Sequence, residues 1–263
     1  MERDRTRFNG EIRRTFSQTP TELRKISRKH LDGAGCYRFR LSYRPPYDWA
    51  QVIGFLAARA TPGVEVVEAH RYQRTISLGS NSGTIAIEPA DEGPALALEV
   101  RFGDPRALMT IVERVRRMFD LGADPVLIAE QLAGDVLLGR VLAAHPGIRT
   151  PGAWDPFEVT VRAILGQQIS VKAATTLAGR IADRWGTAVQ TAECGVRKAE
   201  TPRLNRLFPT PAHLADAPLE DAGIMPARAA TLRTLARAVR DGAVAFDGIS
   251  TLDGLRAIPG IGQ

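Results

Sequence analysis

Apolar and polar residues alternate between Tyr37 and Arg44, with aromatic and leucine side chains on one side and arginine and serine on the other. This period of two predicts a strand with one buried face. Shorter β-type runs, separated by Gly, Asn and Pro, predict strands at 64–69, 72–78, 84–88 and 95–102. Asp48 can cap a helix over 49–60, and a closing helix is expected over 105–119. Residues 36–121 are therefore predicted to form an α+β domain.

Strand patterns stop after Leu121-Gly122, and the rest of the sequence consists of helical segments separated by Gly, Pro, Asp and Thr. Asp155 before Pro156, and Ser170, are placed to cap two of these helices. Residues 193–204 are polar without a clear period, which indicates a loop. Residues 122–263 are thus predicted to be all-α, with helices over 125–132, 135–144, 156–165, 169–185, 210–215, 219–222, 226–241 and 251–257.

Residues 1–35 form a third, shorter region. Phe8, Ile12 and Phe16 recur every four residues, which predicts one apolar stripe on an amphipathic helix, and Pro20 can precede a second short helix. Two short helices of this kind cannot bury a core alone. The region is therefore either a basic leader or the tail of a larger helical DNA-binding domain.

The net charge of +6 is unevenly distributed. Residues 1–44 contain 12 Lys and Arg against 5 Asp and Glu, whereas the remaining residues contain 23 basic and 24 acidic side chains. A basic excess favours a polyanionic partner such as nucleic acid. The first 44 residues therefore carry the positive excess, and the helical half is close to neutral.

Cysteine usage and hydropathy restrict the class of protein further. Cys36 and Cys194 are far apart and belong to no CxxC pair, so a disulfide framework, a zinc site and an iron–sulfur site all lack ligands. The N-terminus is charged where a signal peptide would be apolar, and no apolar run approaches the ~18 residues of a membrane span. These features predict a soluble, cytoplasmic protein with no membrane partner.

The end of the sequence, Ile258-Pro259-Gly260-Ile261-Gly262, follows a predicted helix. Glycines in such a turn let the backbone approach a phosphate and direct N–H groups toward it, as in the hairpin of a helix-hairpin-helix motif. Taken alone, the same residues are also compatible with an ordinary helix stop.

A second informative segment is the corner between the helices predicted at 156–165 and 169–185. Gly166 supplies a turn there, and Gln167 and Gln168 follow it. The two amides can either face a bound duplex or satisfy backbone groups at the helix junction.

Several motifs in order resemble one known family. The sequence Tyr43-Arg44-Pro45-Pro46-Tyr47-Asp48-Trp49, with residues 53–60 after it, is followed by characteristic segments at 117–121, 145–149, 162–168, 208–211 and 258–262. From about Tyr37 to its last residue, the chain resembles AlkA-type DNA-3-methyladenine glycosylase II of the helix-hairpin-helix glycosylase superfamily.

This resemblance implies a TATA-binding-protein-like α+β domain followed by a helix-hairpin-helix glycosylase domain. Such enzymes flip an alkylated base, 3-methyladenine or a related base, out of double-stranded DNA and hydrolyse its N-glycosidic bond. The chemistry is expected to need no cofactor. We expect a bacterial monomer that associates with the nucleoid when it is on DNA.

The resemblance also assigns roles to individual residues. Gln168 takes the position of the wedge that fills the gap left by the flipped base, and Gln167 beside it is expected to face the DNA. Phe55 matches an aromatic residue of the base pocket. The backbone amides assigned to a DNA phosphate are those of Gly260, Ile261 and Gly262. The backbone carbonyls assigned to a monovalent cation are those of Arg256, Ile258 and Ile261.

One family feature has no match in the chain. The catalytic aspartate is expected beyond Gln263, because Asp221, Asp247 and Asp253 precede the hairpin and Asp155 is placed as a helix cap. We therefore expect a glycosylase domain that is incomplete, inactive alone and poorly packed along helices 156–165 and 169–185. The alternative is a non-catalytic DNA-binding regulator or damage-recognition module of the response to alkylation.

The first region resembles a second family. Arg7-Phe8-Asn9, and Thr19-Pro20 with Leu23-Arg24, are similar to the final helices of an AraC-type helix-turn-helix domain. Such domains are fused to this type of glycosylase in Ada–AlkA fusions. Residues 1–35 would then be the C-terminal remnant of that domain, 36–121 the α+β domain and 122–263 the incomplete glycosylase domain.

Overall fold

The computed structural model describes residues 35–189, 204–246 and 251–261. Their contacts form two compact units, which are described separately below. The first contains residues 35–57 and 67–152, and the second contains the described residues of 58–66 and of 153–263. The predicted AraC-type tail lies outside the described residues.

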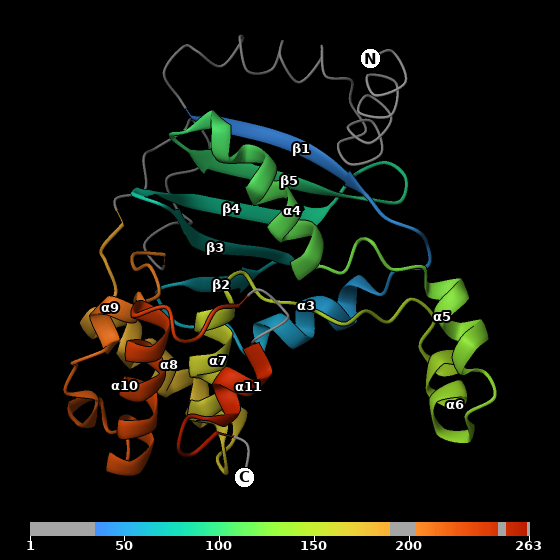
Figure 1. Cartoon of the computed structure of the whole chain (residues 1–263). Helices are drawn as coiled ribbons and strands as arrows, with labels where there is room; N and C mark the ends of the chain where they lie inside the picture. Colours follow the sequence, from blue (N-terminus) through green and yellow to red (C-terminus); the bar gives the residue numbers. More distant parts are fainter. Residues whose placement is uncertain (1–34, 190–203, 247–250, 262–263) are drawn as a thin grey trace, which may run out of the picture. The chain divides into compact units, whose positions relative to one another are not determined.

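The first unit is built on an antiparallel sheet with the strand order β1-β5-β4-β3-β2 (Figure 1). The prediction for the first strand is confirmed, because Tyr37, Phe39 and Leu41 are buried while Arg38 and Arg40 are exposed. The strands are β1 (Cys36–Ser42), β2 (Glu65–Glu68), β3 (Arg71–Leu78), β4 (Asn81–Pro89) and β5 (Ala95–Phe102). A sheet combined with helices of the same unit confirms the α+β class.

Two helices pack with this sheet. Helix α4 (Leu108–Met118) follows the short η1 (Pro105–Ala107) and lies across one face of the sheet (Figure 1), where it buries Ile111, Val112, Val115 and Met118. Helix α3 (Trp49–Ala57) packs against β3 and is capped by Asp48 as predicted, through a hydrogen bond from the N–H of Gln51. Helix α3 ends three residues before the predicted position. Pro62 follows closely, and proline disfavours helical backbone in the residue before it.

Three of the recognised motifs meet in the first unit around Arg149. Its guanidinium donates hydrogen bonds to the backbone carbonyls of Arg44, Pro46 and Ala123, at 2.5, 2.9 and 3.3 Å, and lies 4.9 Å from the ring of Tyr47. Tyr47 in turn donates from its hydroxyl to the carbonyl of Phe119 at 2.7 Å. The segments 43–49, 117–121 and 145–149 thus hold one another in place.

Gly147 makes this approach possible. Its φ is +88°, and a Cβ atom there would lie 2.7 Å from the backbone nitrogen of Tyr47. The carbonyl of Gly147 accepts a hydrogen bond of 2.9 Å from the N–H of Asp48. Any other residue would therefore push the two motifs apart.

Helices α5 (Pro125–Leu132) and α6 (Val136–Ala144) pack chiefly against each other (Figure 1). Large apolar side chains on both helices are exposed, and Pro125 is the one buried residue of the pair. The contacts group this pair with the sheet rather than with the later helices. By these contacts the first compact unit extends to Gly152, and the domain boundary at residue 122 remains a prediction.

The second unit is all-helical in its described part, apart from short bridges and the first residues of β2. Its core combines residues of α7, α8, α10 and the segments between them. The elements are α7 (Pro156–Gly166), α8 (Val171–Trp185), α9 (Pro211–Leu214), η2 (Leu219–Ala222), α10 (Pro226–Arg240) and α11 (Thr251–Arg256). No helix of the described residues is long and apolar enough to cross a membrane.

The expected poor packing of α7 and α8 is not observed. Val161, Leu165 and Ile181 have no exposed surface. Helix α10 contacts both α7 and α9, and η2 contacts α8, so the later segments cover these faces.

Candidate nucleic-acid interface

The corner between α7 and α8 places Gln168 at the surface. Helix α7 ends when the N–H of Gln167 bonds the carbonyl of Ile164 at 3.3 Å, and Ser170 caps α8 as predicted. Gln168 between them has φ +59°, a conformation that non-glycine residues rarely adopt. Its side chain is exposed and has no hydrogen-bond partner among the described residues. Ala69, His70 and Asp120 also have positive φ, but conformations of this kind cluster at functional sites.

The hairpin after α11 is a four-residue turn from Ile258 to Ile261. The N–H of Ile261 bonds the carbonyl of Ile258 at 3.1 Å, and Gly260 has φ +88°. A type II turn requires positive φ at its third position, where glycine is favoured, and proline is common at its second position. A Cβ atom at Gly260 would lie 2.5 Å from Oγ1 of Thr231, so the packing also requires glycine here.

The hydrogen bonding of this turn shows which of the backbone amides assigned to a phosphate already has an acceptor. The amide of Ile261 already donates to Ile258, whereas the amide of Gly260 has no acceptor in the described part of the chain. Gly262 lies outside the described residues. Gly260 is therefore the described amide that remains available to an anion.

The carbonyls assigned to a cation are only partly occupied. Ile258 accepts the turn hydrogen bond and keeps a second lone pair, while Arg256 and Ile261 accept no backbone bond from the described residues outside α11. Carbonyl oxygens of this kind suit a hard monovalent cation. The cation site remains a prediction.

Gln167 joins the corner to the hairpin. Its side-chain amide donates to the carbonyl of Gly260 at 3.2 Å, across 93 residues of sequence. Gln167 is exposed, and its expected orientation toward DNA remains a prediction. Its amide satisfies a backbone group, as the alternative interpretation of the corner holds, but that group belongs to the hairpin rather than to the helix junction.

Helix α10 supports both features. Arg228 donates to the carbonyl of Gln167 at 2.6 Å, and Thr231 donates to the carbonyl of Pro259 at 3.0 Å. Residues three apart lie on the same face of a helix, so one face of α10 contacts the corner and the hairpin together. Neither Arg228 nor Thr231 is predicted from the sequence to belong to this site. The available signal was a basic residue in the first turn of α10, where the helix dipole disfavours positive charge.

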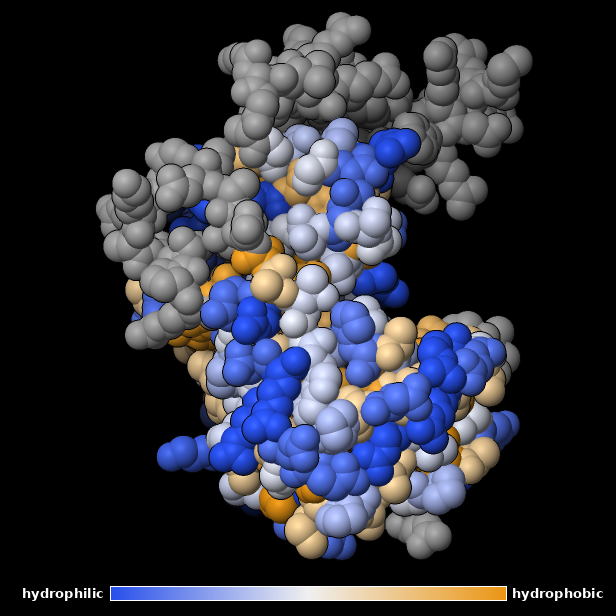
Figure 2. Space-filling view, turned by 90° about the vertical axis from the view of Figure 1, so that its left-hand side faces the viewer, coloured by the Kyte–Doolittle hydropathy of each residue, from blue (hydrophilic) through white to orange (hydrophobic). Residues whose placement is uncertain are grey.

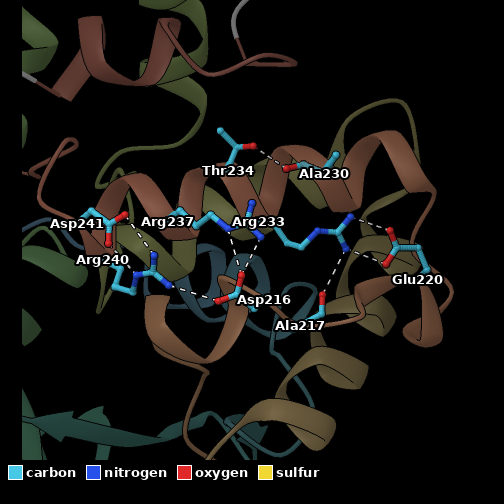
Figure 3. A network of polar contacts seen from close by, with 9 residues as sticks. All are labelled: Asp216, Ala217, Glu220, Ala230, Arg233, Thr234, Arg237, Arg240 and Asp241. Atoms are coloured by element: carbon cyan, nitrogen blue, oxygen red, sulfur yellow. Dashed lines mark hydrogen bonds and ion pairs between the residues drawn. The ribbon is translucent and has the colours of Figure 1, made fainter.

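The arginines farther along α10 are paired with carboxylates (Figure 3). Arg233 binds Glu220 through two hydrogen bonds of 2.8 and 2.9 Å, and this bonding lowers the pKa of Glu220 to about 2. Hydrogen bonding to Arg237 lowers the pKa of Asp216, and Arg240 does the same for Asp241. The face is strongly hydrophilic (Figure 2), but its positive charge is balanced.

Arg162, which belongs to the recognised segment 162–168, has a structural role. Its guanidinium bonds Glu65 at 3.0 Å and Glu158 at 3.3 Å, and also contacts the carbonyl of Arg59. Both carboxylates are buried. This cluster fixes residues 58–66 onto α7.

Phe55, the residue assigned to the base pocket, lies on α3 and is 40% exposed. It belongs to the first unit, whereas Gln168 and Gly260 belong to the second. Its contribution to a pocket remains a prediction.

Comparison with known proteins identifies the family. The sequence model of the AlkA N-terminal domain matches residues 38–155. DNA-3-methyladenine glycosylase 2 of Escherichia coli is 34% identical over 232 residues, which cover 86% of this chain and 77% of that protein. The chain belongs to the AlkA family.

A mycobacterial AlkA aligns over more of the chain. The "Probable bifunctional transcriptional activator/DNA repair enzyme AlkA" of Mycobacterium tuberculosis is 34% identical over 263 residues, covering 97% of this chain and 51% of that protein. The chain thus spans about half the length of this AlkA relative.

Solved structures show the same fold. A 3-methyladenine DNA-glycosylase from Archaeoglobus fulgidus matches with a TM-score of 0.67 and 20% identity, covering 85% of this chain and 75% of that one. An 8-oxoguanine glycosylase/lyase from Clostridium acetobutylicum, in complex with double-stranded DNA, matches with a TM-score of 0.62 and 16% identity over 86% and 72% of the chains. The fold of this AlkA-family chain is therefore that of helix-hairpin-helix DNA glycosylases.

Proposed function

We propose that the protein is the DNA-holding part of a base-excision repair glycosylase that flips alkylated bases out of a duplex and hydrolyses their N-glycosidic bonds. The observation that carries the proposal is Gln168, which is exposed, strained and free of partners among the described residues, on a corner that contacts the Gly260 turn. An exposed side chain that can fill the space of an extruded base, next to an amide that can hold a phosphate, suits base flipping.

Each side chain has a task in this reaction. Gln168 fills the space that the flipped nucleotide leaves, and its amide can both donate to and accept from the unpaired base opposite. The amide of Gly260 holds a backbone phosphate without reading sequence. The carbonyls of Arg256, Ile258 and Ile261 would bind a monovalent cation beside that phosphate.

The substrate class follows from the chemistry of alkylation. A base alkylated at a ring nitrogen, such as 3-methyladenine, is cationic and therefore a good leaving group. An aromatic face such as that of Phe55 attracts a cation in addition to stacking on the base. The chain then needs a carboxylate to stabilise the sugar cation and to assist water. Asp155 is committed to capping α7, and we propose that the catalytic aspartate lies beyond Gln263.

A binding experiment tests the proposal. The 263-residue chain is titrated into two labelled duplexes, one fully paired and one with a stable abasic-site analogue. We expect salt-sensitive binding to both, with a preference for the abasic analogue, because the wedge fills a gap that already exists. Gln168→Ala should reduce this preference, while Gln51→Ala, at an exposed position of α3, should not.

The same samples are then incubated with methylated DNA. We expect no release of 3-methyladenine by the 263-residue chain, and release would overturn the placement of the catalytic aspartate. Absence of duplex binding, or equal affinity for the paired and the abasic duplexes, would overturn the function itself. A DNA-binding regulator predicts the second of these results.

A further inference from the structure

Arg228 occupies a position that local helix energetics disfavours. It is the third residue of α10, after Pro226 and Ala227, so its positive charge lies in the first turn of the helix. The N-terminus of a helix carries partial positive charge and stabilises acidic rather than basic side chains. Departures from such local rules are expected at functional or strained sites.

The contacts of Arg228 provide no compensating negative charge. Its guanidinium donates to the carbonyl of Gln167 at 2.6 Å, and it makes no ion pair with any described residue. Arg233, Arg237 and Arg240 on the same helix all pair with carboxylates (Figure 3). Arg228 is therefore the arginine of α10 whose charge is left unbalanced within the described chain.

The hydrogen bond that Arg228 makes within the described part of the chain fixes where this charge lies. The carbonyl that it binds belongs to the peptide that joins Gln167 to Gln168, and the Gln167 side chain binds the carbonyl of Gly260. The guanidinium is thus held at the place where the wedge corner and the hairpin meet. A guanidinium has five N–H donors in a rigid plane, so most of them remain available.

We propose that Arg228 binds a DNA phosphate beside the wedge, in addition to the phosphate held by the amide of Gly260. Its bond to Gln167 orients the guanidinium in the free protein, which reduces the entropy lost when the phosphate binds. The same bond makes Arg228 a positioning residue for Gln168. This inference rests on the proposed function, because it requires a duplex at the wedge.

The salt dependence of DNA binding tests the phosphate contact. Affinity of the 263-residue chain for a fully paired duplex is measured between low and moderate salt. Each phosphate contact contributes about one unit to the slope of log K against log salt concentration. We expect Arg228→Gln to reduce the slope by about one unit, and Arg228→Lys to retain it because the charge is kept.

Arg237→Gln provides a control of equal net charge on the same helix. Arg237 is paired with Asp216 at 2.8 Å, so its loss should leave the slope unchanged. Circular dichroism of each variant reports whether the helices are retained. If Arg228→Gln and Arg237→Gln give the same slope as the wild-type chain, or both lower it equally, Arg228 binds no phosphate.

Failure of the Arg228 proposal can be distinguished from failure of the proposed function. Failure of the wild-type chain to bind duplex DNA would overturn both proposals. Wild-type binding that prefers the abasic analogue, combined with an unchanged slope for Arg228→Gln, would overturn the present inference alone. A positioning role for Arg228 predicts a weaker abasic preference for Arg228→Lys, because a lysine ammonium cannot reproduce the planar guanidinium contact with Gln167.

Discussion

Helices α5 and α7 begin with the same capping residues but differ in how much of their surface is buried. Each starts with an Asp-Pro pair, in which the aspartate accepts a hydrogen bond from the backbone three residues later. Helix α7 then buries five of its residues, whereas α5 buries its first proline alone. Helix α6, the partner of α5, buries none of its residues.

The difference shows what a cap can and cannot do. A capping aspartate and an N-terminal proline determine where a helix starts, because they act on the first turn. Short helices are marginal in water, so their stability comes from packing an apolar face. Helix α7 has such packing in the core of the second unit, and the α5–α6 pair exposes Val136 and Leu137 at 83% and 71%.

The largest effect is expected at Arg162. Replacement by methionine in Arg162→Met removes the guanidinium that bonds the buried carboxylates of Glu65 and Glu158, and should lower the free energy of unfolding by about 3–5 kcal/mol. Denaturant unfolding of the chain measures the change. The matched variant Arg140→Met, on exposed α6, should stay within about 0.5 kcal/mol of wild type. Equal losses would contradict the assignment of structural importance to α7.

Leu165→Ala tests how much the apolar packing of α7 contributes to stability compared with that of α6. Leu165 on α7 has no exposed surface, and its truncation should cost about 3 kcal/mol through lost burial and the cavity left behind. Leu137→Ala on α6 removes the same atoms from an exposed position, and the unfolding midpoint should hardly move. The ratio of the two losses measures how differently the helices are packed. A small loss for Leu165→Ala would show that the second unit does not unfold as one core.

The sequence predicted helix starts better than it predicted which helices pack. Asp48, Asp155 and Ser170 were assigned as caps and are confirmed, because a cap depends on residues two or three positions away. The exposure of α5 and α6 was not predicted. Their apolar content resembles that of a packed helix, and only the tertiary structure shows that nothing among the described residues covers it.

The candidate site likewise combines features that the local sequence predicts with contacts that it does not predict. A turn at Pro259-Gly260 was predictable, because type II turns have a local sequence signature. The contact of Gln167 with Gly260, and the support of both by Arg228 and Thr231, depend on segments far apart in the chain. No local pattern contains such contacts. The motifs around Arg149 were recognised as a resemblance, and the structure gives their physical reason, which is packing rather than chemistry.

The two capping aspartates offer a more sensitive comparison. Asp155→Ala should lower the free energy of unfolding by about 1 kcal/mol, because α7 unfolds together with the core. Asp124→Ala removes the equivalent bond from α5, which we expect to open locally without the rest of the unit. Hydrogen exchange should therefore accelerate in α5 and α6 while the global unfolding transition stays in place. An equal shift of that transition in both variants would mean that α5 is coupled to the core.

The contact between Glu220 and Arg233 should make the stability of the second unit weakly dependent on pH. The pKa of Glu220 is lowered from 4.5 to about 2 by its hydrogen bonds to Arg233, so the contact stabilises the fold at pH values above 4.5. This contribution is lost as the pH falls toward 2, because the protonated carboxyl can no longer pair with the arginine. Titration of the Glu220 carboxyl by NMR measures the pKa directly. Arg233→Gln should return it toward 4.5, and a wild-type value already near 4.5 would contradict the pairing.

The smallest effect on stability is expected for the double variant Val136→Ser, Leu137→Ser. Both side chains are mostly exposed, so the free energy of unfolding should stay within about 0.5 kcal/mol of wild type. Contiguous exposed apolar surface promotes association, and sedimentation velocity at high protein concentration should show less self-association in the variant. Val159→Ser provides the control, since Val159 is an exposed apolar residue of the packed helix α7, at 44%. A loss of several kcal/mol in the double variant would show that α6 is covered in solution, and the contrast between α5 and α7 would then disappear.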